Sequence, residues 1–105
     1  MSNINTETDP EIEKAKLNLE TAQAAWTDLQ TLFAQGSVIW ADTSLDLIEV
    51  AQGIAQDDSA QVTVWMDANL LAQVSDDQAK KWLAEDAFLW SVVVRPLVLV
   101  QEIKV

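Results

Sequence analysis

Tryptophan and carboxylate side chains are the groups with which this 105-residue chain could do chemistry, because it contains no Cys and no His. Thiol nucleophiles, imidazole bases, disulfides and the usual zinc sites are therefore excluded. Trp26, Trp65 and Trp82 fall on the apolar faces of predicted helices, so we expect them in the core. Trp40 and Trp90, expected on adjacent strands, could instead form a candidate pocket with Trp65, in which the rings and a nearby acid hold an organic cation.

Two pairs of neighbouring acids, Asp57–Asp58 and Asp76–Asp77, could hold Mg²⁺ or Ca²⁺, which prefer carboxylate oxygens. Neither pair has EF-hand spacing or a glycine at a sharp turn. Both fall at predicted helix starts, where capping and the helix dipole already account for acidic residues. We therefore expect neither a metal site at these pairs nor a cofactor.

An enzyme built from this sequence would have to use carboxylates, lysines and Arg95, its single arginine. A pair of carboxylates can perform acid–base chemistry, but it needs a deep cleft, which a chain of this length rarely encloses beside its core. The sequence also lacks the P-loop, GxGxxG, HExxH and nucleophile-elbow motifs. These observations favour a non-catalytic protein.

The apolar run VVVRPLVLV near the C-terminus contains this arginine. Arg95 must either reach solvent or meet an acid, for example one in the predicted helix that contains Asp46 and Glu49. If the run forms an exposed strand edge, the edge can pair with another chain. The candidate interface consists of Arg95, Pro96, Leu97, Val98 and Val100. It predicts self-association or docking of a partner at the edge of the C-terminal strand.

Charge is distributed unevenly along the chain, whose 17 acids and 6 bases give a net charge of −11. No Lys or Arg occurs between Leu17 and Ala79. The acids of this stretch either keep the surface solvated or form a surface for a basic protein partner. Binding to nucleic acid is electrostatically opposed, and we expect none.

Neither end of the sequence predicts a targeting or membrane segment. Residues 1–9 are polar and acidic, which is typical of neither a secretory signal nor a transit peptide. The most apolar stretch, residues 88–100, is shorter than the ~20 apolar residues of a membrane helix and contains Arg95 and Pro96. We therefore expect a cytoplasmic protein that does not bind membranes.

Apolar spacing and capping residues predict five helices. The first begins at Asp9–Pro10 and reaches Trp26 through an apolar stripe of Ile12, Ala15, Leu19 and Ala22. A capping box of Thr27 and Gln30 then starts a short second helix, which ends at Gly36.

Three more helices are expected further along the chain. One carries Leu47 to Ala55 after a cap at Thr43 or Ser44. The next follows Asp57–Asp58 and buries Val62, Trp65 and Met66. The last opens with a capping box of Ser75 and Gln78 and buries Ala79, Trp82 and Leu83.

Strands are expected at residues 38–40, at 70–74 and in the Val-rich tail, 88–103. The tail forms one bent strand or two strands, because Pro96 cannot donate to a ladder. A tight hairpin through Arg95–Pro96 is disfavoured, since such turns prefer residues with positive φ. The expected fold is a single α+β domain over residues 10–105, with five helices packed on a three- or four-stranded sheet, preceded by a frayed tail of residues 1–9.

Several of these residues carry a family resemblance: Trp26, Leu29, Phe33, Gly36, the stretch from Trp40 to Leu47, Asp57–Asp58, Trp65, Trp82, and the tail from Leu89 to Gln101. In this pattern the sequence resembles the small bacterial family called domain of unknown function 2288. Leu97 departs from it, since the family pattern has an aromatic residue after the tail proline. The resemblance implies a short bacterial cytoplasmic protein and supplies no activity and no catalytic residues.

The function expected from the sequence is therefore that of a non-catalytic protein–protein interaction or regulatory module that associates with itself through the C-terminal strand edge or binds a basic protein. The alternative is a binding site for a small ligand or a divalent metal, built from tryptophans and carboxylates.

Overall fold

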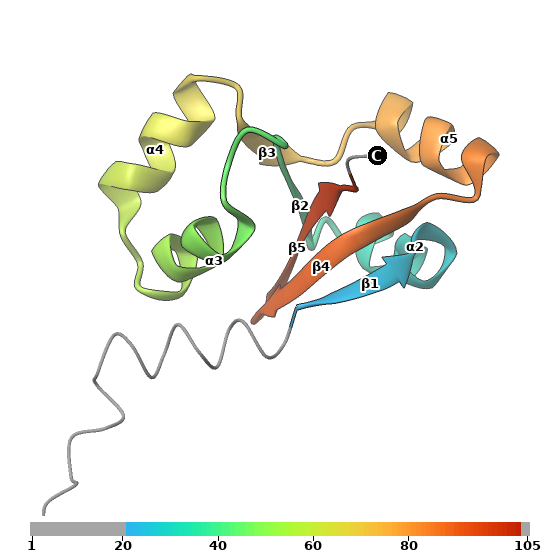
Figure 1. Cartoon of the computed structure of the whole chain (residues 1–105), viewed down its shortest axis with the longest axis horizontal. Helices are drawn as coiled ribbons and strands as arrows, with labels where there is room; N and C mark the ends of the chain where they lie inside the picture. The colour runs from blue at the N-terminus through green and yellow to red at the C-terminus, as the bar shows by residue number, and fades with distance from the viewer. Residues whose placement is uncertain (1–20, 104–105) are drawn as a thin grey trace, which may run out of the picture.

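The computed structural model describes residues 21–103, which form one five-stranded sheet with helices on both of its faces (Figure 1). The elements are β1 (Ala22–Ala25), α2 (Trp26–Ala34), β2 (Val38–Ala41), α3 (Leu47–Ala55), α4 (Ser59–Asp67), β3 (Leu71–Gln73), α5 (Asp76–Glu85), β4 (Phe88–Val94) and β5 (Leu97–Glu102). The α+β class is confirmed. The counts differ, since the described residues contain four helices and five strands. None of these helices is long and apolar enough to cross a membrane.

The strands lie in the order β1-β4-β5-β2-β3. β5 pairs with β4 in antiparallel and with β2 in parallel orientation, so the C-terminal strand is interior to the sheet. The expectation that this strand forms an edge is therefore wrong, and the edges are β1 and β3. Trp40 on β2 and Trp90 on β4 are likewise not on adjacent strands, because β5 separates them.

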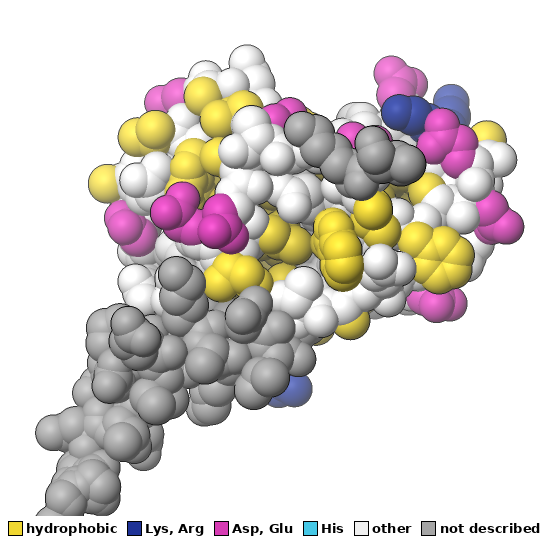
Figure 2. Space-filling view, viewed as in Figure 1, with side chains coloured by type: hydrophobic (Ala, Val, Ile, Leu, Met, Phe, Trp, Pro, Cys, Tyr) yellow, Lys and Arg dark blue, Asp and Glu magenta, His cyan; other side chains and the backbone are white. Residues whose placement is uncertain are grey.

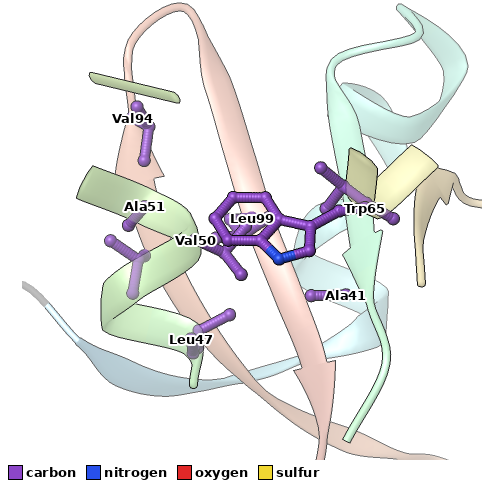
Figure 3. Packing of buried hydrophobic residues seen from close by; sticks show 9 residues of the cluster. Ala41, Leu47, Val50, Ala51, Trp65, Val94 and Leu99 are labelled. Atoms are coloured by element: carbon purple, nitrogen blue, oxygen red, sulfur yellow. The ribbon is translucent and has the colours of Figure 1, made fainter. Parts of the chain in front are cut away.

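Two hydrophobic cores lie on opposite faces of the sheet, because successive side chains of a strand point to opposite sides. The α3–α4 core consists of Ala41, Leu47, Val50, Ala51, Trp65, Leu71, Val92, Val94 and Leu99. The α2–α5 core consists of Trp26, Leu29, Val38, Val74, Trp82, Leu89, Val98 and Val100. In Figure 3 the Trp65 ring lies among Leu99, Val50 and Ala41. The sheet is thus the middle layer of three.

The segment Ala22–Ala25 is a strand, which corrects the prediction that the first helix extends to Trp26. It pairs in antiparallel orientation with β4, from Ala22 opposite Ser91 to Ala25 opposite Phe88. The rest of that predicted helix, from Pro10, and the predicted frayed tail lie outside the described residues. Helix α2 follows β1 directly, and the Trp26 amide donates a hydrogen bond of 2.9 Å to the Ala87 carbonyl.

No side chain caps the start of α2, so the capping box of Thr27 and Gln30 is wrong. Its other end agrees with the prediction: Gly36 follows the helix with a φ of 75°, and its amide donates to the Phe33 carbonyl at 2.9 Å. A residue with a side chain rarely adopts this left-handed backbone.

The predicted starts of α4 and α5 are confirmed. The Ser75 box at α5 is confirmed, and the Asp58 carboxylate accepts from the Gln61 amide at the start of α4. Helix α3 is capped by Asp46 instead of the expected Thr43 or Ser44.

The tail contains two strands, β4 and β5, joined at Arg95–Pro96 with Val94 opposite Leu97. The hairpin that the sequence disfavoured is therefore present. The Arg95–Pro96 peptide bond is cis. Pro96 lies in the turn between the two strands, so the ladder does not need the amide that proline lacks.

Candidate functional site

The three tryptophans of the candidate pocket do not meet in the structure. Trp65 lies in the α3–α4 core, where only 7% of it is exposed, and Trp90 packs against the same core. Trp40 lies on the other face of the sheet, against the α2–α5 core. The expected burial of Trp26, Trp65 and Trp82 is confirmed.

The tryptophan indole nitrogens of the α2–α5 core differ in their hydrogen-bond partners. Trp82 Nε1 donates to Glu102 Oε2 at 3.2 Å, and Lys81 Nζ lies 3.7 Å from the same oxygen. Trp26 Nε1 and Trp40 Nε1 are buried and have no hydrogen-bond partner among residues 21–103. The Trp26 and Trp82 rings meet edge to face, with centroids 5.1 Å apart. These rings therefore fill the core and hold the end of β5.

Both acidic pairs lie at the starts of helices. Asp58 is the N-cap of α4, and Asp76 and Asp77 lie in the first turn of α5. Asp57 has a left-handed backbone with a φ of 57°, at the turn between α3 and α4. Within the part of the chain that the structure describes, no three acids come together in a group that could hold a metal ion.

The candidate interface residues are distributed between a turn and the sheet interior. Arg95 and Pro96 are exposed at the hairpin turn, and Arg95 forms no ion pair with another described residue. Val98 and Val100 are buried in β5, which is paired on both sides. Leu97 is half-buried and lines a groove that the sequence analysis did not identify.

This groove, which we call the β3 groove, has a volume of about 300 Å³. It lies between the end of α3, the helix α4 and the side of the sheet that ends in β3. Its lining residues are Ile39, Gly53, Ile54, Asp57, Ser59, Val62, Met66, Leu71, Ala72, Gln73 and Leu97. Asp57, Ser59 and Gln73 are the polar side chains in an otherwise apolar lining.

Two of the groove's residues were expected to be buried. Val62 is half-buried and 53% of Met66 is exposed, although both were assigned to the buried face of α4 with Trp65. Leu83 of α5 departs in the same way, with 49% exposed. The apolar residues Val62 and Met66, which surround Trp65 in the sequence of α4, are the signal that could have indicated an open apolar surface.

The edge of the sheet beside the groove has free hydrogen-bonding positions. The Leu70 carbonyl accepts from Asp42 at 2.8 Å, and the Val74 amide donates to Val38 at 3.4 Å, so these groups face β2. Backbone groups alternate in direction along a strand, and those of Leu71 and Gln73 therefore point away from β2. Within residues 21–103, β3 pairs with no strand other than β2.

The surroundings of the groove are acidic. No lysine or arginine lines it, and Asp57 supplies a carboxylate. A polar cleft of about 250 Å³ opens between the same two helices and shares Gly53 with it, lined also by Glu49, Gln52, Gln56, Asp58, Gln61 and Trp65. In Figure 2 acidic and apolar side chains are interspersed over α3 and α4, and no basic side chain is seen over α4.

The sequence and the structure are similar to those of known proteins. The sequence matches the family described as "Protein of unknown function (DUF2288)" over residues 12–102. The chain is similar to the NMR solution structure of PA1075 from Pseudomonas aeruginosa, with 40% sequence identity and a TM-score of 0.79. This similarity covers 100% of the present chain and 95% of that one. No curated protein matches the sequence.

Proposed function

The chain belongs to the DUF2288 family, and we propose that it is a non-catalytic protein-interaction module of the cytoplasm that docks a partner at the β3 groove. The observation that carries this proposal is the position of the groove, where an apolar depression of about 300 Å³ adjoins β3, which pairs only with β2 among the described strands. Exposed strand edges pair readily with other chains, and apolar depressions accept their side chains.

The lining of the groove supports docking over catalysis. Asp57 and Ser59 are its carboxylate and its hydroxyl, and no second titratable group lines it. General acid–base catalysis needs a group with a suitable pKa within hydrogen-bond reach of the substrate, usually together with a second group. The small-ligand alternative built from Trp40, Trp65 and Trp90 has no support, since Trp40 lies on the opposite face of the sheet from Trp65 and Trp90.

Charge favours a basic protein as the partner over a second copy of the chain. Each copy carries a net charge of −11, so two copies repel each other at low ionic strength. The same repulsion opposes binding to nucleic acid and to anionic lipid surfaces. A partner with exposed lysines or arginines is instead attracted to the acidic surface around α3 and α4.

Affinity capture with matched variants tests the proposal. Met66→Glu places a charge at the mouth of the groove, and Leu83→Glu makes the same change on α5 at a residue of nearly equal exposure, 49% against 53%. We expect wild type and Leu83→Glu to capture the same proteins from a bacterial lysate, and Met66→Glu to lose a defined subset of them. Identical capture by all three baits, with unchanged melting temperatures, would refute docking at the groove.

A further inference from the structure

We infer that the β3 groove recognises an extended basic segment of its partner, which adds to the sheet as a strand beside β3 and places an apolar side chain in the groove. This inference rests on the proposed function and names the chemistry of the partner. It follows from three properties of the site: the direction of the β3 backbone groups, the composition of the groove and the distribution of charge around it.

The backbone of β3 can pair with a further strand. The amides and carbonyls of Leu71 and Gln73 point away from β2. Leu71 is only 3% exposed, whereas Gln73 is exposed and offers one donor and one acceptor to an added chain. Native proteins commonly protect edges with Lys, Pro or bulges, and the sequence of β3, Leu-Ala-Gln, contains no such residue. The side chains of β3 therefore carry no charge that would oppose an added strand.

The β3 groove distinguishes the two edges of the sheet. β1 also has one unpaired side among the described residues, but its residues do not line this groove. Backbone hydrogen bonds alone give little sequence specificity, whereas pockets for alternate side chains supply it. The combination of edge and groove selects β3.

The groove fits side chains of an extended segment. Its volume of about 300 Å³ lies at the lower limit of small-molecule pockets and suits one or two side chains rather than a folded element. Val62 and Met66 of α4 form one wall, and Ile39 and Leu71 of the sheet lie on its floor. Because residues of a strand alternate between its faces, every second residue of the added segment would point toward α4.

Charge determines which extended segments are accepted. Asp57 lines the groove, Asp58 follows it at the start of α4, and the sequence from Leu17 to Ala79 contains no base to neutralise them. Lysine or arginine residues at the ends of the added segment would be attracted to this surface, and acidic ones would be repelled. The preferred segment is therefore apolar in the middle and basic at its ends.

Two synthetic peptides test the inference on the full, isotopically labelled chain. Both have the same short core of valine and leucine, flanked in one by lysines and in the other by glutamates. We expect the lysine peptide to shift the NMR resonances of Val62 and Met66 and to slow amide hydrogen exchange at Gln73, the exposed residue of β3 whose amide points away from β2. Exchange at Ala72 should not change, because its amide faces β2. We expect the glutamate peptide to bind at least about tenfold more weakly.

Matched variants separate the contributions of the groove and the charge. Met66→Glu should weaken binding of the lysine peptide about tenfold or more, and Leu83→Glu should leave it unchanged. Asp57→Asn should weaken it about two- to fivefold, the effect of one exposed charge pair. Asn tolerates the left-handed backbone at this position, and Asp86→Asn is the control, since Asp86 has a φ of 54° against 57° for Asp57.

Each part of the inference has its own refutation. Shifts at Val62 and Met66 without slower exchange at Gln73 would overturn strand addition. Equal affinity for the two peptides would overturn the preference for a basic segment. If neither peptide shifts the groove resonances at millimolar concentration, the inference as a whole fails. The proposed function is judged separately by the capture experiment, because Met66→Glu can lose a partner that does not bind as an extended strand.

Discussion

Substituting Gly53 by alanine should destabilise the protein, although the same change usually stabilises a helix. Gly53 lies in α3 and is buried against the Trp65 ring of α4. A Cβ at this position would lie 3.1 Å from Cζ3 and 3.2 Å from Cη2 of that ring. These separations are shorter than ordinary van der Waals contact, so the ring or the helix must shift by a few tenths of an ångström.

Two opposing effects determine the change in the free energy of unfolding. Replacing a glycine by alanine in a helix interior contributes about 1 kcal/mol of stability. Overpacking of a well-filled core costs about 1–3 kcal/mol. Trp65 is only 7% exposed and packs among Val50 and Leu99, which restricts its movement away from α3 (Figure 3). We therefore expect a net loss of about 1 kcal/mol, which lowers the melting temperature by about 4–8 °C in a domain of this size.

Urea and thermal unfolding followed by circular dichroism would measure this change. The control is the same substitution in a Trp65→Leu background, where the atoms that Cβ would meet are absent. There Gly53→Ala should stabilise by about 1 kcal/mol relative to Trp65→Leu alone. The two backgrounds should thus differ by about 2 kcal/mol of coupling energy between the residues. If Gly53→Ala stabilises both backgrounds equally, the ring moves aside freely and the packing described for this core is incorrect.

Three further predictions concern the ends of elements and the oligomeric state. Glu102→Ala removes the acceptor of buried Trp82 Nε1 and should cost about 1–3 kcal/mol in unfolding experiments. Lys81→Ala removes only the exposed ion pair to Glu102 and should change stability by less than about 1 kcal/mol; equal losses would contradict this assignment. Ser75→Ala breaks the capping box with Gln78 and should lower stability by about 1 kcal/mol, whereas an unchanged urea midpoint would show that the cap is dispensable. Light scattering at low salt should give a monomer of 11.6 kDa, and a stable dimer would contradict the charge argument.

Local signals in the sequence predicted several elements because their causes lie within a few residues. Asp58 and Ser75 have side chains that satisfy the first amides of the helices they precede, and Gly36 adopts the left-handed backbone that ends α2. Such effects act within one turn and need no knowledge of the rest of the fold. Asp46 shows the limit of this reasoning, since the possible caps Thr43, Ser44 and Asp46 lie close together and local chemistry does not decide which one is used.

The segment Ala22–Ala25 could not be assigned from local preference. Its alanines and glutamine are good helix formers, and they continue the apolar spacing of the preceding residues. In the structure its backbone groups pair with β4, which lies more than sixty residues further along the chain. Pairing partners at this separation leave no periodic signal in the shorter segment, and tertiary hydrogen bonds override its propensity.

The position of β5 depends on the same kind of long-range information. The tail is almost continuously apolar, which predicts a strand covered on both faces, and the burial of Val98, Leu99 and Val100 agrees. Coverage of the faces does not determine whether the edges are paired. Parallel pairing with β2, with Trp40 opposite Val100, is what places β5 inside the sheet and leaves β3 as an edge.

Helix α4 connects this topology to the candidate site. Core packing accounts for the presence of Trp65 in this helix, because the ring fills the α3–α4 core. It does not account for Val64 and Met66, which are exposed on the same short helix. An isolated exposed apolar residue such as Val64 needs no explanation, but Met66 lines the β3 groove together with Val62 and Leu71. If the groove binds the basic segment proposed above, Asp57 in its lining and Asp58 beside it supply the attraction, while Val62 and Met66 supply the apolar contact.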